Sequence, residues 1–150
     1  MNFNKRKFIK TLKINKLLKW IYPHIRKRRL LSKDNKKISL GAAIGAFYAV
    51  LVPIGQIPLA LMTSYILKAN ILAASITTFL SNPVTYIPFY LIAYQIGYFI
   101  LSLFLTVSVI SLGYIGYALS LVVGLITFAS LLSTTVYFVL RLYFYIRKLL

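Results

Sequence analysis

Six residues in the apolar middle of the chain form a candidate anion-binding site. They are Gly55, Gln56, Lys68, Asn82, Thr85 and Tyr86. Amide and hydroxyl groups beside one cation suit a phosphate or carboxylate, particularly where helices begin and turn their positive ends toward the ligand. The sequence therefore predicts that these residues bind an anionic substrate. The alternative is that Lys68 is an ordinary loop residue and that Asn82 caps a helix.

Catalytic chemistry has little support in the same sequence. The chain contains one acidic residue, Asp34, one histidine, His24, and no cysteine. Both Asp34 and His24 lie in the basic N-terminal part, so a carboxylate pair, a Ser-His-Asp arrangement and a metal site with several ligands are all missing. We expect no enzymatic activity, no bound metal and no cofactor.

The elements that position the candidate site are interrupted by two proline pairs. The runs 53–58 and 83–88 share the pattern Pro-x-x-x-Ile-Pro and lie thirty residues apart. Proline removes an amide donor and clashes with the preceding turn, so each pair predicts a helix, a break and a second helix. Pro58 and Pro88 should occupy the first turn of the second helix. In a bilayer the freed backbone groups need protein or water partners, which polar residues near the breaks supply.

Two topologies fit this pattern. In the first, residues 38–67 and 71–97 are re-entrant hairpins, and residues 98–113 and 116–140 are full spans. In the second, both proline-containing repeats are kinked crossings of opposite direction, which gives an inverted repeat. Lys68 lies on the cytoplasmic side in the first and on the opposite side in the second. The first is favoured because each apolar half is shorter than the twenty or so residues that span a bilayer.

Composition places these elements in a membrane. The chain of 150 residues is 60% hydrophobic and carries a net charge of +17, and its mean hydropathy is +0.82. Fourteen of the eighteen Lys and Arg residues precede position 38, and three of the others lie at 141, 147 and 148. By the positive-inside rule both termini are cytoplasmic. We expect an all-α, multi-pass protein of the bacterial inner membrane whose basic residues contact anionic lipids rather than nucleic acid.

The chain divides into three expected regions. Residues 1–37 form a basic cytoplasmic arm, residues 38–110 the membrane core with both proline pairs, and residues 111–150 a transmembrane helix with a basic tail. Apolar residues within the arm recur at helical spacing, which predicts an amphipathic helix lying on the membrane or on the protein itself. These residues are Ile14, Leu17, Leu18, Ile21 and Tyr22.

Five short motifs resemble the bacterial DUF2062 family over about residues 37–101. They are Gly41-Ala-Ala-Ile-Gly45, Pro53-x-Gly55-Gln56-x-Pro58, Lys68-Ala-Asn70, Ser81-Asn82-Pro83-x-Thr85-x-x-Pro88-x-Tyr90 and Ala93-Tyr94-x-x-Gly97. The resemblance implies a small inner-membrane protein, and some relatives join this domain to a glycosyltransferase that uses a lipid-phosphate carrier. Lys68 stands where the family pattern has Arg, so the positive charge is kept but the bidentate phosphate geometry of Arg is not. The resemblance implies no catalytic residue.

Two functions follow as expectations. The first is binding and translocation of an anionic lipid-like substrate such as a polyprenyl phosphate. The second is a non-catalytic scaffold that anchors a glycosyltransferase or another envelope-synthesis enzyme at the membrane. An ion channel is less favoured because no ring of charges is visible. A homodimer is expected, since Gly41, Gly45 and Ala49 form a small-residue face that allows close helix packing.

Overall fold

The computed structural model describes residues 31, 33–104 and 109–150, and this part of the chain is entirely helical, with no strand. It contains five α-helices: α3 (Asn35–Leu51), α4 (Gln56–Ile66), α5 (Ile71–Thr78), α6 (Pro83–Phe104) and α7 (Tyr114–Leu149). A short 3-10 helix, η1 (Val109–Leu112), precedes α7. The predicted all-α class is confirmed for these residues. The amphipathic helix predicted in the arm lies outside them.

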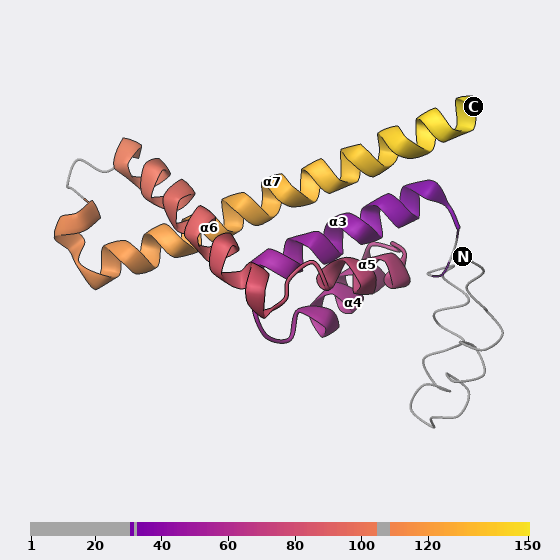
Figure 1. Ribbon diagram of the computed structural model, residues 1–150. Helices are drawn as coiled ribbons and strands as arrows, with labels where there is room; N and C mark the ends of the chain where they lie inside the picture. Colours follow the sequence, from indigo (N-terminus) through magenta and orange to yellow (C-terminus); the bar gives the residue numbers. More distant parts are fainter. Residues whose placement is uncertain (1–30, 32, 105–108) are drawn as a thin grey trace, which may run out of the picture.

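Helix α7 forms the long axis of the molecule (Figure 1). Its 36 residues extend over about 54 Å at 1.5 Å per residue. Helix α6 crosses the N-terminal half of α7, and α3 runs beside the C-terminal half with α4 and α5 packed against it. The Ser133 hydroxyl of α7 donates to the Ala43 carbonyl of α3 at 2.9 Å. The start of α3 and the end of α7 therefore lie at the same end of the molecule.

Glycine and alanine allow the helices to approach backbone to backbone. A Cβ atom at Gly97 would overlap the Ser120 carbonyl, and one at Gly124 would overlap the Ala93 carbonyl. The same holds for Gly41 and Gly45, which lie against Asn70 and Ala74 of the α5 segment. The small-residue face of α3 expected to serve a homodimer is thus occupied within the chain by α5.

Two of the described helices are long and apolar enough to cross a membrane, Val84–Phe104 within α6 and Tyr114–Leu149. In their most apolar windows only 11% and 22% of the residues are buried. The core helix of a soluble protein would be mostly buried, so this exposure favours contact with lipid.

The two proline-containing segments do not form equivalent repeats. The first one turns back, since α4 returns along α3 and Tyr48 and Thr63 share a hydroxyl hydrogen bond of 2.8 Å. The second one leads away along α7 as the 22-residue helix α6 (Figure 1). The predicted re-entrant hairpin over 71–97 and the separate span over 98–113 are therefore wrong, because α6 continues through Tyr98.

The positions of the prolines explain part of this difference. Pro58 is the third residue of α4, in its first turn as predicted. Pro88 lies inside α6 rather than in the first turn of a new helix, so that prediction is wrong. Pro83 instead occupies the first position of α6, where the absence of an amide hydrogen costs little.

Candidate anion-binding site

The two interruptions, residues 52–55 and 79–82, lie against each other in space. The Ser81 hydroxyl donates to Gln56 Oε1 at 2.7 Å. The Tyr86 hydroxyl donates to the Pro53 carbonyl at 2.6 Å. Four of the predicted site residues, Gln56, Asn82, Thr85 and Tyr86, are therefore brought to one place together with Gly55. In these contacts Gln56 and Tyr86 bind the neighbouring interruption.

Asn82 and Thr85 form a reciprocal cap at the start of α6. The Asn82 side-chain oxygen accepts from the Val84 amide at 2.9 Å and from the Thr85 amide at 3.0 Å. The Thr85 hydroxyl oxygen accepts from the Asn82 amide at 2.8 Å. This arrangement is a capping box, with threonine in the position that glutamate commonly takes. The cap that the sequence offered as an alternative for Asn82 is thus present.

Gly55 precedes α4 in the left-handed conformation, with φ of 80°. No side chain caps this helix start, because glycine has none. A Cβ atom there would meet nothing within 4 Å, so the constraint on Gly55 comes from its backbone conformation alone. Gly55 therefore supplies the reversal between α3 and α4.

Lys68 lies apart from the other five residues. It follows the 11-residue helix α4, whose other end begins at Gln56, so the two ends are about 16 Å apart. Lys68 has a φ of 56°, and the amide of the next residue, Ala69, donates to the Ser64 carbonyl at 2.9 Å. This is the Schellman termination of a helix, in which glycine usually takes the left-handed position. The structure thus gives Lys68 a role in ending α4.

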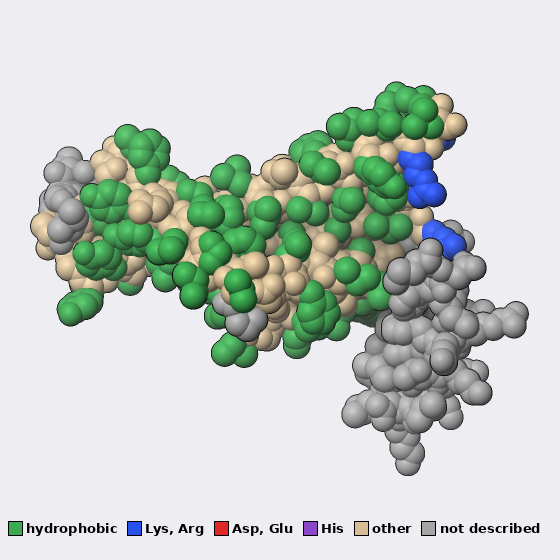
Figure 2. All heavy atoms as spheres, in the orientation of Figure 1, with side chains coloured by type: hydrophobic (Ala, Val, Ile, Leu, Met, Phe, Trp, Pro, Cys, Tyr) green, Lys and Arg blue, Asp and Glu red, His purple; other side chains and the backbone are tan. Residues whose placement is uncertain are grey.

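Lys68 instead joins the basic end of the molecule. Two residues further on, the Asn70 amide donates to the Lys37 carbonyl at 2.9 Å, which places the α4–α5 link beside the start of α3. Figure 2 shows Lys and Arg side chains at that one end of an otherwise apolar face. The described cations comprise Lys33, Lys36, Lys37, Lys68, Arg141, Arg147 and Lys148.

A groove of ≈ 280 Å³ opens at the basic end between the start of α3 and the end of α7. It is lined by Asn35, Phe144, Arg147 and Lys148. Two cations beside an aromatic ring suit a ligand with an anionic group and an apolar part. Sequence reasoning missed this groove because it treated the C-terminal cations only as a topology signal. The helical spacing of Phe144, Arg147 and Lys148, at i, i+3 and i+4, is the signal that could have found it.

Together these features define a class: a helical protein with two helices suited to cross a membrane, a basic end and a pair of joined interruptions. Residues 18–149 match the family described as "Uncharacterized protein conserved in bacteria (DUF2062)". The chain belongs to this family. The match extends beyond the expected 37–101 to include part of the arm and all of α7. No curated protein and no solved structure matches the chain.

Proposed function

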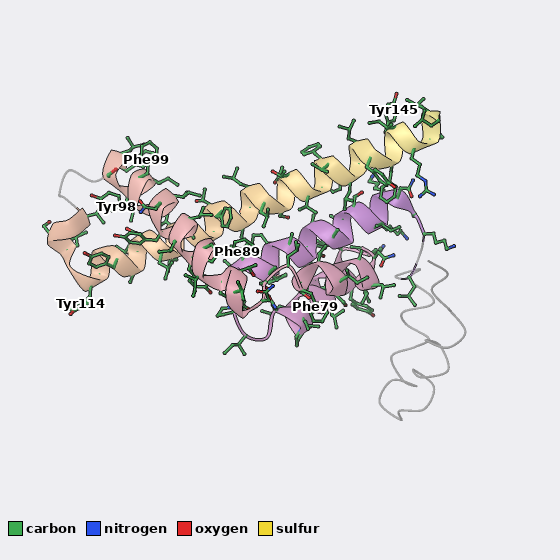
Figure 3. All side chains as sticks on the ribbon, viewed as in Figure 1. Phe79, Phe89, Tyr98, Phe99, Tyr114 and Tyr145 are labelled. Carbon is green, nitrogen blue, oxygen red and sulfur yellow. The ribbon has the colours of Figure 1, made fainter. Side chains whose placement is uncertain are left out.

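We propose that the chain is a multi-pass protein of the bacterial inner membrane with its basic end in the cytoplasm. The α3–α4 hairpin starts and ends near Lys37 and Lys68, α6 leads away and α7 returns, so both ends of the described chain lie on the same side. Tyr98, Phe99 and Tyr114 lie at the end opposite Tyr145 (Figure 3). Aromatic residues at both ends fit two membrane interfaces, and clustered cations fit the cytoplasmic one.

The groove at the basic end is the best-supported place for a ligand. Arg147 and Lys148 supply positive charge where headgroups of the cytoplasmic leaflet lie, and each such cation contributes about 1 kcal/mol near anionic lipid. Phe144 supplies an apolar wall for the first part of a lipid chain. The ligand in this proposal is a lipid-like phosphate, such as a polyprenyl phosphate. The observation that carries the proposal is that Arg147 and Lys148 line this groove at the basic end of the molecule.

Translocation of this lipid is the finer part of the proposal, and it uses the joined interruptions. A headgroup that crosses a bilayer needs polar partners below the surface. Gln56, Ser81 and Tyr86 provide them once the bonds Ser81–Gln56 and Tyr86–Pro53 open. Lipid binding at the basic end does not depend on this opening, so binding and translocation are separable.

Native mass spectrometry of the gently extracted protein tests the binding site. The double variant Arg147→Gln, Lys148→Gln should lose a stoichiometric phospholipid or polyprenyl phosphate that the wild type retains. Lys68→Gly is the matched control, because it removes a cation from the same end but outside the groove lining. Equal retention by all three proteins, or an apo mass for the wild type, would reject the groove as a lipid site.

A scaffold without transport is the second candidate. It is favoured by the mutual hydrogen bonding of the interruptions, which leaves Gln56 and Tyr86 engaged with the protein itself. In this case the basic arm recruits a cytoplasmic glycosyltransferase or another envelope-synthesis enzyme, and the chain has no catalytic activity. Deletion of residues 1–36 would then abolish the envelope phenotype, whereas Gln56→Ala would leave it intact. If the chain transports a lipid, Gln56→Ala should instead abolish the envelope phenotype.

A further inference from the structure

One exposed polar side chain in the middle of α6 is not used by the fold. Gln95 is exposed, and its neighbours on the outer surface of the helix are apolar. Leu91 is 60% exposed and Phe99 63% exposed. We call Val84, Leu91, Gln95 and Phe99 the Gln95 face. It carries a single carboxamide within a helix that is otherwise suited to contact lipid.

The Gln95 face points directly away from the rest of the chain. Helix α6 contacts α7 through Ala93 and Gly97, which lie against Gly124 and Ser120. At about 100° per residue, Gln95 lies about 180° around the helix from the midpoint of these two contact residues. Gln95 is also about 18 Å from the start of α6 and about 6 Å, one helical turn, from Phe99, so it lies within the apolar layer on the inner side of the interface proposed at Phe99.

The amide of Gln95 has no hydrogen-bond partner within the described part of the chain, whereas three exposed hydroxyls of the two long helices bond to their own backbone. The hydroxyls of Ser102, Ser130 and Thr135 each donate to a carbonyl of their own helix. A carboxamide has two donor hydrogens and one acceptor oxygen, and it is costly to leave these unsatisfied in hydrocarbon. A partner at the same depth is therefore required if α6 spans the bilayer.

We propose that the Gln95 face is the contact between two copies of this chain, with Gln95 of one copy hydrogen-bonded to Gln95 of the other. A carboxamide is self-complementary, so a twofold axis at this residue lets each amide donate to its partner's oxygen. Such an interface is isologous and closes as a dimer. Leu91 and Phe99 pack on either side of the polar pair. The small residues of α6 are used against α7, so this contact differs from the close glycine crossings inside the chain.

Cysteine cross-linking in native membranes tests this contact, since the chain has no cysteine of its own. Gln95→Cys, Leu91→Cys and Phe99→Cys should each give a disulfide-linked dimer on mild oxidation. Val122→Cys is the matched control. Gly97 faces Ser120 and Ala93 faces Gly124, so the residues midway between them, Gln95 on α6 and Val122 on α7, lie at the same depth. Val122 is 54% exposed. Cross-linking of Val122→Cys equal to that of Gln95→Cys would overturn the assignment.

The hydrogen bond itself is tested by dilution in lipid vesicles, with energy transfer between labelled copies as the readout. Gln95→Leu should weaken dimerisation about threefold to thirtyfold, and Gln95→Asn should retain part of the affinity. Unchanged or tighter association of Gln95→Leu would overturn the proposed pair. Because the Gln95 amide makes no hydrogen bond within the described residues, Gln95→Leu should fold as the wild type does, which thermal unfolding in detergent verifies.

This proposal rests on the membrane placement proposed above, and the two can fail separately. Extraction of the chain from membranes by alkaline carbonate would reject the placement. Retention in the membrane without cross-linking at positions 91, 95 or 99 would reject only the dimer contact. Native mass spectrometry could instead find the wild type as a monomer with a bound lipid that the Gln95→Leu variant lacks. That result would assign the Gln95 face to lipid and overturn the dimer.

Discussion

The two interruptions share one proline pattern but have opposite consequences for the chain. After residues 52–55 the chain reverses, and α4 packs back onto α3. After residues 79–82 it continues as α6, which leads away to cross α7. A Pro-x-x-x-Ile-Pro sequence therefore fixes where a helix is interrupted and leaves the direction of the next helix to other residues.

Two local features account for the difference. Gly55 takes a left-handed conformation and provides no side-chain cap, so the first interruption is a backbone turn. Asn82 and Thr85 each accept a hydrogen bond from the backbone amide of the other, and this reciprocal cap fixes how α6 begins. Beyond the cap, Gly97 and Gly124 hold α6 against α7. The first interruption thus depends on one glycine, and the second on a cap and a distant helix crossing.

The largest expected effect comes from breaking the crossing that directs α6. Gly124→Val places a branched side chain against the Ala93 carbonyl, so the two helices must separate. We expect a loss of about 3 kcal/mol in the free energy of unfolding, at the upper end for overpacking. Unfolding by SDS in mixed micelles, followed by circular dichroism, measures it.

The control for this variant lies on the same helix. Ala118→Val introduces the same valine side chain at an exposed position of α7 and should change stability by less than about 0.5 kcal/mol. If both variants unfold at the same SDS fraction, the glycine crossing does not direct α6, and the cap alone would have to do so.

A smaller effect is expected at the cap. Asn82→Ala removes the acceptor for the Val84 and Thr85 amides, and we expect a loss of about 1–2 kcal/mol. Asn82→Asp keeps an acceptor in place and should recover most of this stability. Thermal unfolding in detergent compares the three proteins. An Asn82→Ala protein as stable as the wild type would show that the second interruption does not rely on its cap.

Local features, namely the helix interruptions, one helix cap and the basic end, were predicted best from the sequence. The proline pairs located both interruptions, and the cap expected as the alternative role of Asn82 is present. The charge distribution separated a basic end from an apolar body. These signals operate over a few residues, where the chain has few alternatives.

The predictions that were wrong concern contacts between segments that are distant in the sequence. The predicted hairpin over 71–97 ignored Ala93 and Gly97, whose small size only matters once Gly124 lies opposite. Lys68 was grouped with Gln56 and Asn82 because all three are polar groups in an apolar stretch. Their separation follows from the 11 residues of α4, which carry Lys68 back to Lys37. Spacing along the chain could not show that the helix between them runs toward the basic end.

The smallest effects concern the two left-handed residues at either end of α4, and they should have opposite signs. Gly55→Ala puts a Cβ atom on a residue with φ of 80° in open space, so only backbone strain opposes it. We expect a loss of about 1 kcal/mol, which is the strain less the entropy that alanine removes from the unfolded chain. Lys68→Gly relieves the strain at φ of 56° and should gain about 0.5 kcal/mol. Thermal unfolding in detergent measures both variants. A loss at Lys68→Gly would show that the lysine side chain stabilises this end through a contact of its own.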